Sequence, residues 1–279
     1  MVNLNGVLVP ASGSPLAANR AFLYGDGIFE TVKILDGKVL FLEDHYFRLM
    51  SGMRIIRMEI PMNFTMEFFE NQLLKTAVAN GCLPSGRARM TVYRNSGGFY
   101  LPTDNHVEYI VQAHSLDHAM YLIDQRIYEV DLFKDFYITA QLLSTIKSTN
   151  RLVNITGSIF AEENGLANCL LINDSKNVVE GLQGNLFMLS GNKLITPPLA
   201  DGCLNGVMRK QILALARKTE GIEVVEASIS PFDLQKADEL FLTNVIAGIR
   251  PITKYRKKEF PTVFAESLLV KLNAQVRLG

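Results

Sequence analysis

The chain has 279 residues, of which 48% are hydrophobic, and its 28 basic and 28 acidic residues give a formal net charge of zero. This balance argues against a nucleic-acid-binding protein, which normally carries a basic excess or a basic patch. The length suits one large domain or two domains of ordinary size.

Cysteine and histidine usage narrows the class further. The three cysteines are odd in number and far apart, which is typical of reduced thiols in a cytoplasmic protein. The four histidines show no ligand pairing on a helix face, so we expect no metal site. No stretch is apolar enough for a membrane span, and the N-terminus lacks the segments of a signal peptide. We therefore expect a cytoplasmic protein that binds neither nucleic acid nor a membrane.

The first half of the chain alternates like strands and then repeats like helices. Asp36-Gly37 lies between two alternating apolar runs and predicts a hairpin, because both turn residues need a positive φ. Two helical patterns follow over 43–58 and 65–81, the second ending at Gly81, a residue typical of a helix stop. Residues 87–95 and 107–116 then predict paired strands around a Gly-rich loop.

The second half mixes further strands with helices. Helical patterns cover 149–164, 205–219 and 261–276, and strand patterns cover 136–143, 168–174, 178–183, 186–190 and 193–198. Because the two types do not alternate regularly, we predict a mixed α/β or α+β fold. A composition shift near 116–124 indicates an interdomain connection. It separates a smaller N-terminal α/β domain, 1–117, from a larger C-terminal domain, 125–279.

Lys147 is the first candidate functional residue. It follows a mostly apolar run from Ile138 to Ile146, in which we predict a strand. A lysine at the end of a buried strand can be desolvated, which lowers its pKa toward that of a nucleophilic amine. The alternative is a solvated lysine in a turn between a strand and a helix.

Three other features could accompany such an amine. Glu180 follows two apolar residues, and if buried it needs a partner, whereas the alternative is an exposed hairpin residue. Asn205 could cap the helix predicted from 205, whose first-turn N–H groups would form an anion site or simply an ordinary helix start. Arg48, on the helix beginning near Glu43, is suited to bidentate phosphate contact or to the surface.

These residue types together have a specific chemical use. A lysine, a carboxylate, a helix N-terminus and an arginine are the parts needed to hold pyridoxal 5′-phosphate. The lysine forms a Schiff base, the acid pairs with the pyridinium nitrogen, and the other two bind the phosphate.

In their order along the chain, these features resemble the fold-type IV pyridoxal-phosphate enzymes, which include branched-chain and D-amino-acid aminotransferases and aminodeoxychorismate lyases. The resemblance covers nearly the whole chain. Six segments carry it: RAFLYGDGIFETV at 20–32, FLEDHYFRL at 41–49, IKSTNRLVN at 146–154, VVEGLQGNLFML at 178–189, TPPLADGCLNGVMRKQIL at 196–213 and ADELFLTNVIAGIRPI at 237–252.

The resemblance implies a role for particular residues. Lys147 would be the Schiff-base lysine, carried by the C-terminal domain, and would later shuttle a proton. Glu180 would keep the pyridine nitrogen protonated. The remaining cofactor residues would be the phosphate-binding Arg48, Leu204 behind the ring, the backbone N–H groups of Val207 and Met208, and Thr243 and Asn244 in the second phosphate-side loop. The family fold is two α/β domains with the cofactor between them, usually as a homodimer whose partner helps to close each site.

Three details favour the aminodeoxychorismate lyases within this family. Asn150-Arg151-Leu152 follows the lysine as in lyases, 242–252 resembles the lyase's Asn-containing loop, and 95–102 partly resembles its S-G-G-R-G-Y segment. The implied reaction releases pyruvate and 4-aminobenzoate from 4-amino-4-deoxychorismate in folate precursor synthesis. The alternative is an aminotransferase acting on branched-chain or D-amino acids, which would share every cofactor residue.

Some positions depart from the family pattern. Phe99 stands where the lyase segment has arginine, so a substrate carboxylate would need another cation, for which Arg94 and Arg250 are candidates. Phe29 is a further candidate substrate-binding residue. Val245 replaces a threonine that often donates a hydrogen bond to the phosphate. These departures leave cofactor binding intact but bear on the identity of the small amine or amino-acid substrate.

Overall fold

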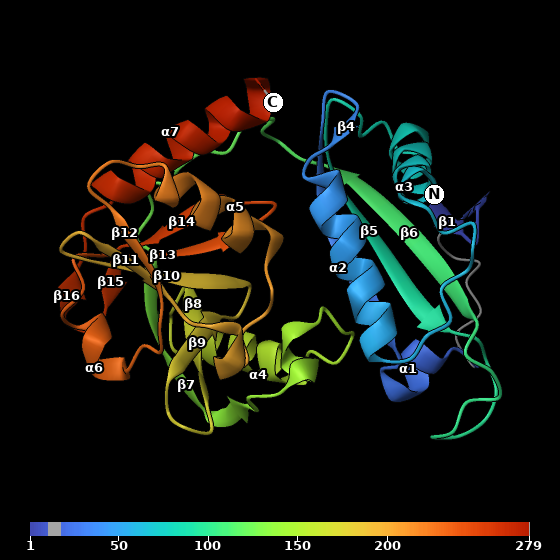
Figure 1. The fold of residues 1–279 in the computed structure, drawn as a ribbon, viewed down its shortest axis with the longest axis horizontal. Coiled ribbons are helices and arrows are strands. Elements are labelled where there is room, and N and C mark those ends of the chain that lie inside the picture. Colours follow the sequence, from blue (N-terminus) through green and yellow to red (C-terminus); the bar gives the residue numbers. More distant parts are fainter. Residues whose placement is uncertain (11–17, 279) are drawn as a thin grey trace. The chain divides into compact units, whose positions relative to one another are not determined.

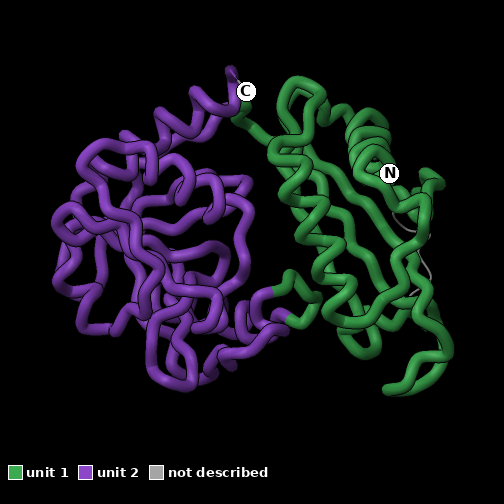
Figure 2. Tube along the Cα trace, in the orientation of Figure 1, with its two compact units in different colours: residues 1–119, 146–150 green, residues 120–145, 151–279 purple. Residues whose placement is uncertain are grey.

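The computed structural model describes residues 1–10 and 18–278. The chain divides into two compact units, which Figure 2 shows in different colours. Unit 1 comprises residues 1–119 and 146–150, and unit 2 comprises residues 120–145 and 151–279.

Unit 1 contains a six-stranded sheet with strand order β2-β1-β6-β5-β3-β4 (Figure 1). Its strands are β1 (Val2–Leu4), β2 (Val7–Val9), β3 (Gly27–Leu35), β4 (Lys38–Val39), β5 (Ser85–Arg94) and β6 (Val107–Ser115), and its helices are α1 (Arg20–Tyr24), α2 (Leu42–Ile55) and α3 (Met66–Ala79). All strand pairs in this sheet are antiparallel.

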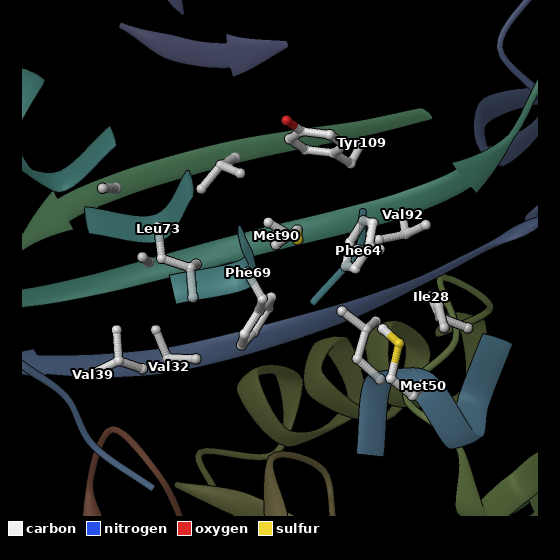
Figure 3. Close-up of a cluster of buried hydrophobic side chains, with 14 of the residues drawn as sticks. Ile28, Val32, Val39, Met50, Phe64, Phe69, Leu73, Met90, Val92 and Tyr109 are labelled. Carbon is white, nitrogen blue, oxygen red and sulfur yellow. The ribbon is translucent and has the colours of Figure 1, made fainter. Parts of the chain in front are cut away.

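The core of unit 1 lies between one face of this sheet and helices α2 and α3. Alternate residues of the strands, such as Val32 of β3 and Met90 of β5, are fully buried there (Figure 3). Met50 of α2 and Phe69 of α3 pack against them in the same cluster. Because side chains alternate across a strand, the neighbouring residues of β3 and β5 face the other side of the sheet.

Unit 2 contains a ten-stranded mixed sheet. Its strands are β7 (Glu129–Ile138), β8 (Asn168–Asn173), β9 (Val178–Gly181), β10 (Gly184–Ser190), β11 (Lys193–Thr196), β12 (Glu223–Glu226), β13 (Glu239–Asn244), β14 (Gly248–Ile252), β15 (Lys254–Tyr255) and β16 (Lys258–Glu259). Its helices are α4 (Leu152–Glu163), α5 (Val207–Arg217), α6 (Pro231–Leu234) and α7 (Val263–Leu278), and Leu142–Thr145 and Leu199–Asp201 form 3₁₀ turns.

Two crossover helices explain two of the three parallel strand pairs in unit 2, the third being β7 with β15. Helix α4 connects β7 to β8 and helix α5 connects β11 to β12, and both strand pairs are parallel. A parallel pair needs such a long connection, whereas antiparallel neighbours such as β9 and β10 are joined by tight turns. The fold is therefore mixed α/β, and the predicted fold class is confirmed.

Several local predictions from sequence are confirmed. Asp36 and Gly37 have φ values of 49° and 76° and join β3 to β4, as the hairpin requires. Gly81 has φ 66° immediately after the cap of α3. The strands predicted at 87–95 and 107–116 pair as β5 and β6. The three helices predicted in the second half are also present, each starting two or three residues later than expected.

The strand predicted at 136–143 differs from the structure. Strand β7 ends at Ile138, and a 3₁₀ turn with exposed Leu142 and Leu143 separates it from Lys147. The Ser144 and Thr145 hydroxyls donate to backbone carbonyls in this segment, and such local bonds compete with strand pairing. Lys147 therefore does not end a buried strand.

The lysine also lies in a different unit from the one expected. Residues 146–150 belong to unit 1, whereas Lys147 was assigned to the C-terminal domain. The reason is backbone pairing with β3. The Phe29 N–H donates to the Lys147 carbonyl at 2.8 Å, and the Thr149 N–H donates to the Gly27 carbonyl at 2.9 Å.

Within residues 1–10 and 18–278, no helix combines the length and apolarity that a membrane-spanning segment needs.

Candidate functional site

Lys147 is held against β3 by the backbone of its own segment. Ser148 forms a bridge with Ile28, and the side chains of Thr149 and Asn150 both donate to the Gly25 carbonyl. The lysine Nζ lies 4.5 Å from the centre of the Phe29 ring. The structure thus brings together two of the residues predicted from sequence, and Lys147 is half-buried.

Arg89 is a second cation at the same ring. It lies on β5, opposite Thr31 of β3, on the sheet face away from the helices. Its guanidinium carbon lies 3.7 Å from the centre of the Phe29 ring, and its Nε donates to the Thr91 hydroxyl at 3.3 Å. The sequence did not single out Arg89, because only the pairing of β3 with β5 places it beside Phe29, which lies 60 positions earlier in the chain.

Arg48 forms a bidentate ion pair with Glu30 on the helix-covered face of the sheet. Its Nε and Nη2 donate to the two carboxylate oxygens at 2.7 and 2.6 Å. His45, one helical turn before Arg48, contacts the same carboxylate through Nδ1 at 2.7 Å. The pair uses the Nε–Nη2 edge, so a phosphate contact of Arg48 would have to use its Nη1 edge.

Burial and charge set the ionisation of this cluster. Burial raises the pKa of Glu30, but the charge of Arg48 and the hydrogen bonds from Arg48 and His45 outweigh it and lower that pKa to about 2. Burial lowers the pKa of His45, against the opposing effect of Glu30. Glu30 is therefore an anion and His45 is neutral at physiological pH, with Nδ1 as the donor to Glu30. A charged residue at a core-facing strand position was the sequence signal that could have identified Glu30.

Arg94, a candidate carboxylate-binding residue, forms its hydrogen bonds within unit 1. It is buried, and its Nε donates to Asp26 at 3.0 Å. Its other nitrogens donate to Asn105 and to the carbonyls of 56–57. Arg20 completes the cluster with a 2.8 Å bond to Asp26. This geometry gives Arg94 a structural role and does not support its substrate role.

Arg20 also fixes the Gly-rich loop that follows β5. Its Nη1 donates to the carbonyls of Gly97, Gly98 and Phe99. The loop positions beyond this anchor are strongly exposed, with Phe99 at 82% and Tyr100 at 93%. The loop base is thus rigidly held, while its apolar tip projects from unit 1.

Glu180 is buried in unit 2 as part of a polar row across the sheet. Glu180 of β9 lies opposite Asn185 of β10, which lies opposite Thr243 of β13. Cross-strand partners project from the same face, so the three side chains are neighbours. All three are at least nine-tenths buried, and the Thr243 hydroxyl has no hydrogen-bond partner among the described residues.

The first two members of this row fix the Leu204 peptide. The Leu204 N–H donates to the Glu180 carboxylate at 2.9 Å, and Asn185 Nδ2 donates to the Leu204 carbonyl at 2.8 Å. A Cβ at Gly206 would lie 1.9 Å from the Asn185 amide oxygen, so glycine is required for this close approach. The buried carboxylate therefore has a hydrogen-bonding partner, as its burial demands.

Helix α5 begins directly after this arrangement, at Val207. Its N-cap is Gly206 and not Asn205, and a glycine has no side chain with which to cap the first turn. Met208 follows in the first turn. The predicted cap was wrong because the chain needs residue 206, and not 205, in the extended cap conformation. The first-turn N–H groups of a helix suit an anion.

The hairpin between β13 and β14 contains the other predicted loop residues. Asn244 ends β13, and its side-chain oxygen accepts from the Ile246 and Ala247 N–H groups at 3.0 and 2.8 Å. Arg250 of β14 donates to Asp124 at 2.7 Å and lies over the Tyr128 ring. Arg250 is thus also engaged within its own unit, which does not support its substrate role.

The described residues fit pyridoxal 5′-phosphate on chemical grounds. Of the predicted cofactor residues, Lys147 and Arg48 belong to unit 1, and the remaining ones belong to unit 2. Within unit 2, the buried Glu180 carboxylate suits a ring nitrogen. The start of helix α5 suits a phosphate, as does the Thr243 hydroxyl, which has no hydrogen-bond partner among the described residues. Among the described residues, no group of three or more His, Cys, Asp and Glu side chains could hold a metal ion.

Comparisons with known proteins agree with this chemistry. A model of the family "Amino-transferase class IV" matches residues 27–255. The chain is 31% identical over 252 residues to a "Putative branched-chain-amino-acid aminotransferase" of Methanocaldococcus jannaschii, covering 90% of this chain and 86% of the relative. It is 25% identical over 253 residues to an aminodeoxychorismate lyase of Vibrio harveyi, covering 90% and 89%.

A solved structure shares the fold. A branched-chain amino acid aminotransferase from T.th., solved with pyridoxamine 5′-phosphate, has a TM-score of 0.86 and 22% sequence identity, covering 99% of this chain and 93% of that chain.

Proposed function

Because this chain belongs to the class IV aminotransferase family, we propose that it acts on the primary amine of a small carboxylate-bearing substrate. Its cofactor is pyridoxal 5′-phosphate, as family membership and the pyridoxamine-phosphate complex of a structural relative indicate. When bound, this group supplies an electron sink for the carbon that bears the amine.

One observation in unit 1 carries the proposal. The Lys147 amine and the Arg89 guanidinium both lie against the Phe29 ring, at 4.5 and 3.7 Å from its centre. A guanidinium binds a carboxylate through two parallel hydrogen bonds. Lys147 would hold the cofactor and move a proton at the amine-bearing carbon, while Arg89 would orient a carboxylate of the substrate.

The other residues would hold the cofactor in a defined state. Glu180, fixed by the Leu204 N–H, would keep the ring nitrogen protonated. Arg48, fixed by Glu30, and the first-turn N–H groups at Val207 and Met208 would bind the phosphate. Thr243 and Asn244 would support the same end from β13 and its hairpin.

Among reactions of this type, we propose 4-amino-4-deoxychorismate lyase activity, in folate precursor synthesis. Lys147 would take the proton from the amine-bearing carbon, and the bond from the neighbouring carbon to the enolpyruvyl oxygen would break. The expelled enolpyruvate takes up a proton and becomes pyruvate, and the ring becomes aromatic 4-aminobenzoate. The lyase-like segments at 150–152, 242–252 and 95–102 support this choice, as does the Vibrio harveyi relative.

A second candidate is an aminotransferase for branched-chain or D-amino acids. The 31% identity to the Methanocaldococcus jannaschii protein favours it. The purified protein would be assayed for pyruvate release from 4-amino-4-deoxychorismate, and for glutamate formation from 2-oxoglutarate with leucine or D-alanine. We expect the first activity, and turnover of the second substrates alone would replace the lyase by the aminotransferase.

The lysine assignment has its own test. Borohydride reduction of the pyridoxal-phosphate-loaded protein should leave a pyridoxyl adduct on the peptide that contains Lys147, detectable by mass spectrometry. The Lys147→Ala variant should lose the adduct, whereas Lys33→Met, which changes another lysine of unit 1, should retain it. An adduct on another lysine of the wild-type protein would refute the assignment.

We also propose that the protein is a homodimer. Unit 1 exposes six large apolar residues on α1 and on the Gly-rich loop, namely Phe22, Leu23, Tyr24, Phe99, Tyr100 and Leu101. The Tyr24 and Tyr100 rings lie 6.0 Å apart, so the two segments form one apolar surface. A surface of this kind is typical of a protein–protein interface.

A further inference from the structure

Helix α4 has apolar residues on two opposite sides. On one side Gly157 and Ala161 are buried, and a Cβ at Gly157 would lie 2.5 Å from a side chain of the unit 2 core. On the other side Leu152, Ile155 and Ile159 are 75%, 53% and 50% exposed. A helix that is apolar on both sides is normally covered on both.

The three exposed residues form one stripe, which we call the α4 stripe. They follow one another at intervals of three and four residues, so they lie on the same side of the helix over two turns. This is the spacing of the seam along which two helices pack, with the side chains of one helix inserted between those of the other. The α4 stripe is therefore suited to a second helix of the same kind.

The charges at the ends of α4 are the reverse of those that a helix dipole favours. Acidic residues stabilise the first turn of a helix and basic residues the last turn. Helix α4 has Arg151 at its N-cap and no acidic residue in its first turn, whereas Glu162 and Glu163 lie in its last turn. Helix α7 has the favoured arrangement, with Glu266 in the first turn and Arg277 in the last.

This charge distribution is complementary to a second α4 in the opposite direction. An antiparallel copy would place the two glutamates of one helix beside the positive N-terminal end of the other. A parallel copy would bring the two pairs of glutamates together, where they repel one another. The charges thus select both the partner and its direction.

We infer that the α4 stripe is a contact surface for a second copy of this chain, in which two α4 helices pack antiparallel about a two-fold axis. The axis would bring the two copies of Ile155 together and place Leu152 of one copy beside Ile159 of the other. The inference rests on the homodimer proposed above, to which it adds a contact in unit 2. It involves none of the residues assigned to the cofactor or the substrate.

Cysteine cross-linking tests the pairing directly. The axes of packed helices lie about 8 to 10 Å apart, so two Ile155→Cys side chains at the two-fold axis would be within reach of a disulfide. Two Leu152→Cys side chains would be separated by about 10 Å along the helices and should not form one. The three native cysteines are buried, so the wild type supplies the background. Mild oxidation followed by non-reducing electrophoresis would detect the linked dimer.

Substitution by aspartate gives a second measurement. Ile155→Asp would bring a charge into the apolar contact and should raise the dimer dissociation constant at least about tenfold. Val270→Asp is the matched control, because Val270 is a 69% exposed apolar residue on α7, another helix of unit 2. Both positions are exposed, so neither substitution should unfold the unit. Sedimentation velocity over a concentration series would measure the association.

A cross-link in Ile155→Cys but not in Leu152→Cys, with association weakened by Ile155→Asp and not by Val270→Asp, would support the inference. Equal cross-linking of both cysteine variants would indicate parallel helices, and no cross-link in either would leave the stripe to another occupant. Either result would overturn the inference, as would equal effects of the two aspartate substitutions.

The same measurements distinguish this inference from the proposed homodimer. A monomeric wild type would refute both. A dimer that Tyr100→Asp weakens, but that forms no cross-link in Ile155→Cys, would refute the α4 contact alone.

Discussion

Glu30 is the residue whose ionisation is most directly linked to the stability of unit 1. It is 1% exposed and accepts hydrogen bonds from Arg48 and His45, and its pKa lies at about 2 in place of 4.5. A carboxyl group whose pKa is lowered by folding stabilises the fold at pH values above its pKa in the unfolded state. This contribution is lost as the pH falls through its pKa in the folded state. His45 adds to the acid sensitivity, because a buried neutral imidazole loses stability as the pH falls below its unfolded pKa of 6.5.

The Glu30→Gln variant should therefore differ from the wild type in a pH-dependent way. The wild type should exceed Glu30→Gln in free energy of unfolding, and this excess should be largest near pH 6. At pH 3 the excess should be smaller by about 2 kcal/mol. Urea titrations at both pH values would measure it. Glu239→Gln is a control of opposite sign: burial raises the pKa of this carboxyl, so its stabilisation relative to glutamine declines as the pH rises. A Glu30→Gln difference that does not change with pH would contradict the assignment.

Arg89 is the residue to which we assign the substrate carboxylate. Arg89→Met keeps much of the side-chain volume but removes the guanidinium, so it should raise the KM for the substrate at least about tenfold, while the dissociation constant of pyridoxal phosphate stays unchanged. Steady-state kinetics and a cofactor titration would check both. Arg87→Met is the matched control, because Arg87 lies two residues along the same strand and face. Equal effects of the two substitutions would show that general charge, and not a specific contact, binds the substrate.

At the scale of elements, the β13–β14 hairpin depends on a glycine for two separate reasons. Gly248 has φ 72°, which strains any other residue, and its missing side chain leaves room for the Tyr121 ring. Gly221 has a similar φ of 78°, but open space surrounds its Cβ position. A comparison of substitutions at the two glycines therefore separates the effect of backbone strain from the effect of close packing.

Both Gly248→Ala and Gly221→Ala should lose about 1 kcal/mol through backbone strain. Gly248→Ala should lose a further 1 to 3 kcal/mol, roughly, through overpacking against Tyr121. Urea unfolding of the two variants would measure the difference. Equal losses would mean that the Tyr121 ring moves aside without cost.

At the scale of the whole molecule, the proposed homodimer has a defined apolar surface. Tyr100, one of its six residues, is 93% exposed, and an aspartate there would bring an unpaired charge into the interface. Tyr100→Asp should therefore raise the dimer dissociation constant at least about tenfold, which corresponds to about 1.4 kcal/mol. Sedimentation velocity over a concentration series would detect the shift.

Met62→Asp is the control for this substitution. Met62 is fully exposed in unit 1 and is not part of the six-residue apolar surface. Its substitution should leave the association state unchanged. A dimer that resists Tyr100→Asp would place the interface elsewhere on the molecule.

Local patterns in the sequence predicted much of the fold. The hairpin at Asp36-Gly37 and the stop at Gly81 follow from positive φ, a property of single residues. Helical periodicity located α2 and α3 but did not fix which side of α2 faces the core. Phe47 is 57% exposed, because the buried side of α2 is centred on Leu49, Met50 and Met53. Periodicity tolerates such rotation, since several residues can border an apolar face.

These local patterns did not predict contacts between residues that are far apart in the chain. The run before Lys147 is apolar enough for a strand, but hydroxyl–carbonyl bonds turn it away from β7. Arg94 and Arg250 looked like free cations because their partners, Asp26 and Asp124, lie 68 and 126 positions away in the sequence. Arg89 and Tyr121 gave no local signal at all, because their importance depends on what the fold places beside them.

The sequence by itself determined the family, the class of fold and the types of residue at the site. Motifs, turn glycines and helical periods are local patterns, which residues close together in the chain specify. Only the tertiary structure decided that Lys147 joins β3 in unit 1, that Glu30 holds Arg48, and that Glu180 and Asn185 fix the Leu204 peptide. Each of these contacts joins residues far apart in the chain. Their formation depends on sheet register and burial, which are properties of the packed molecule.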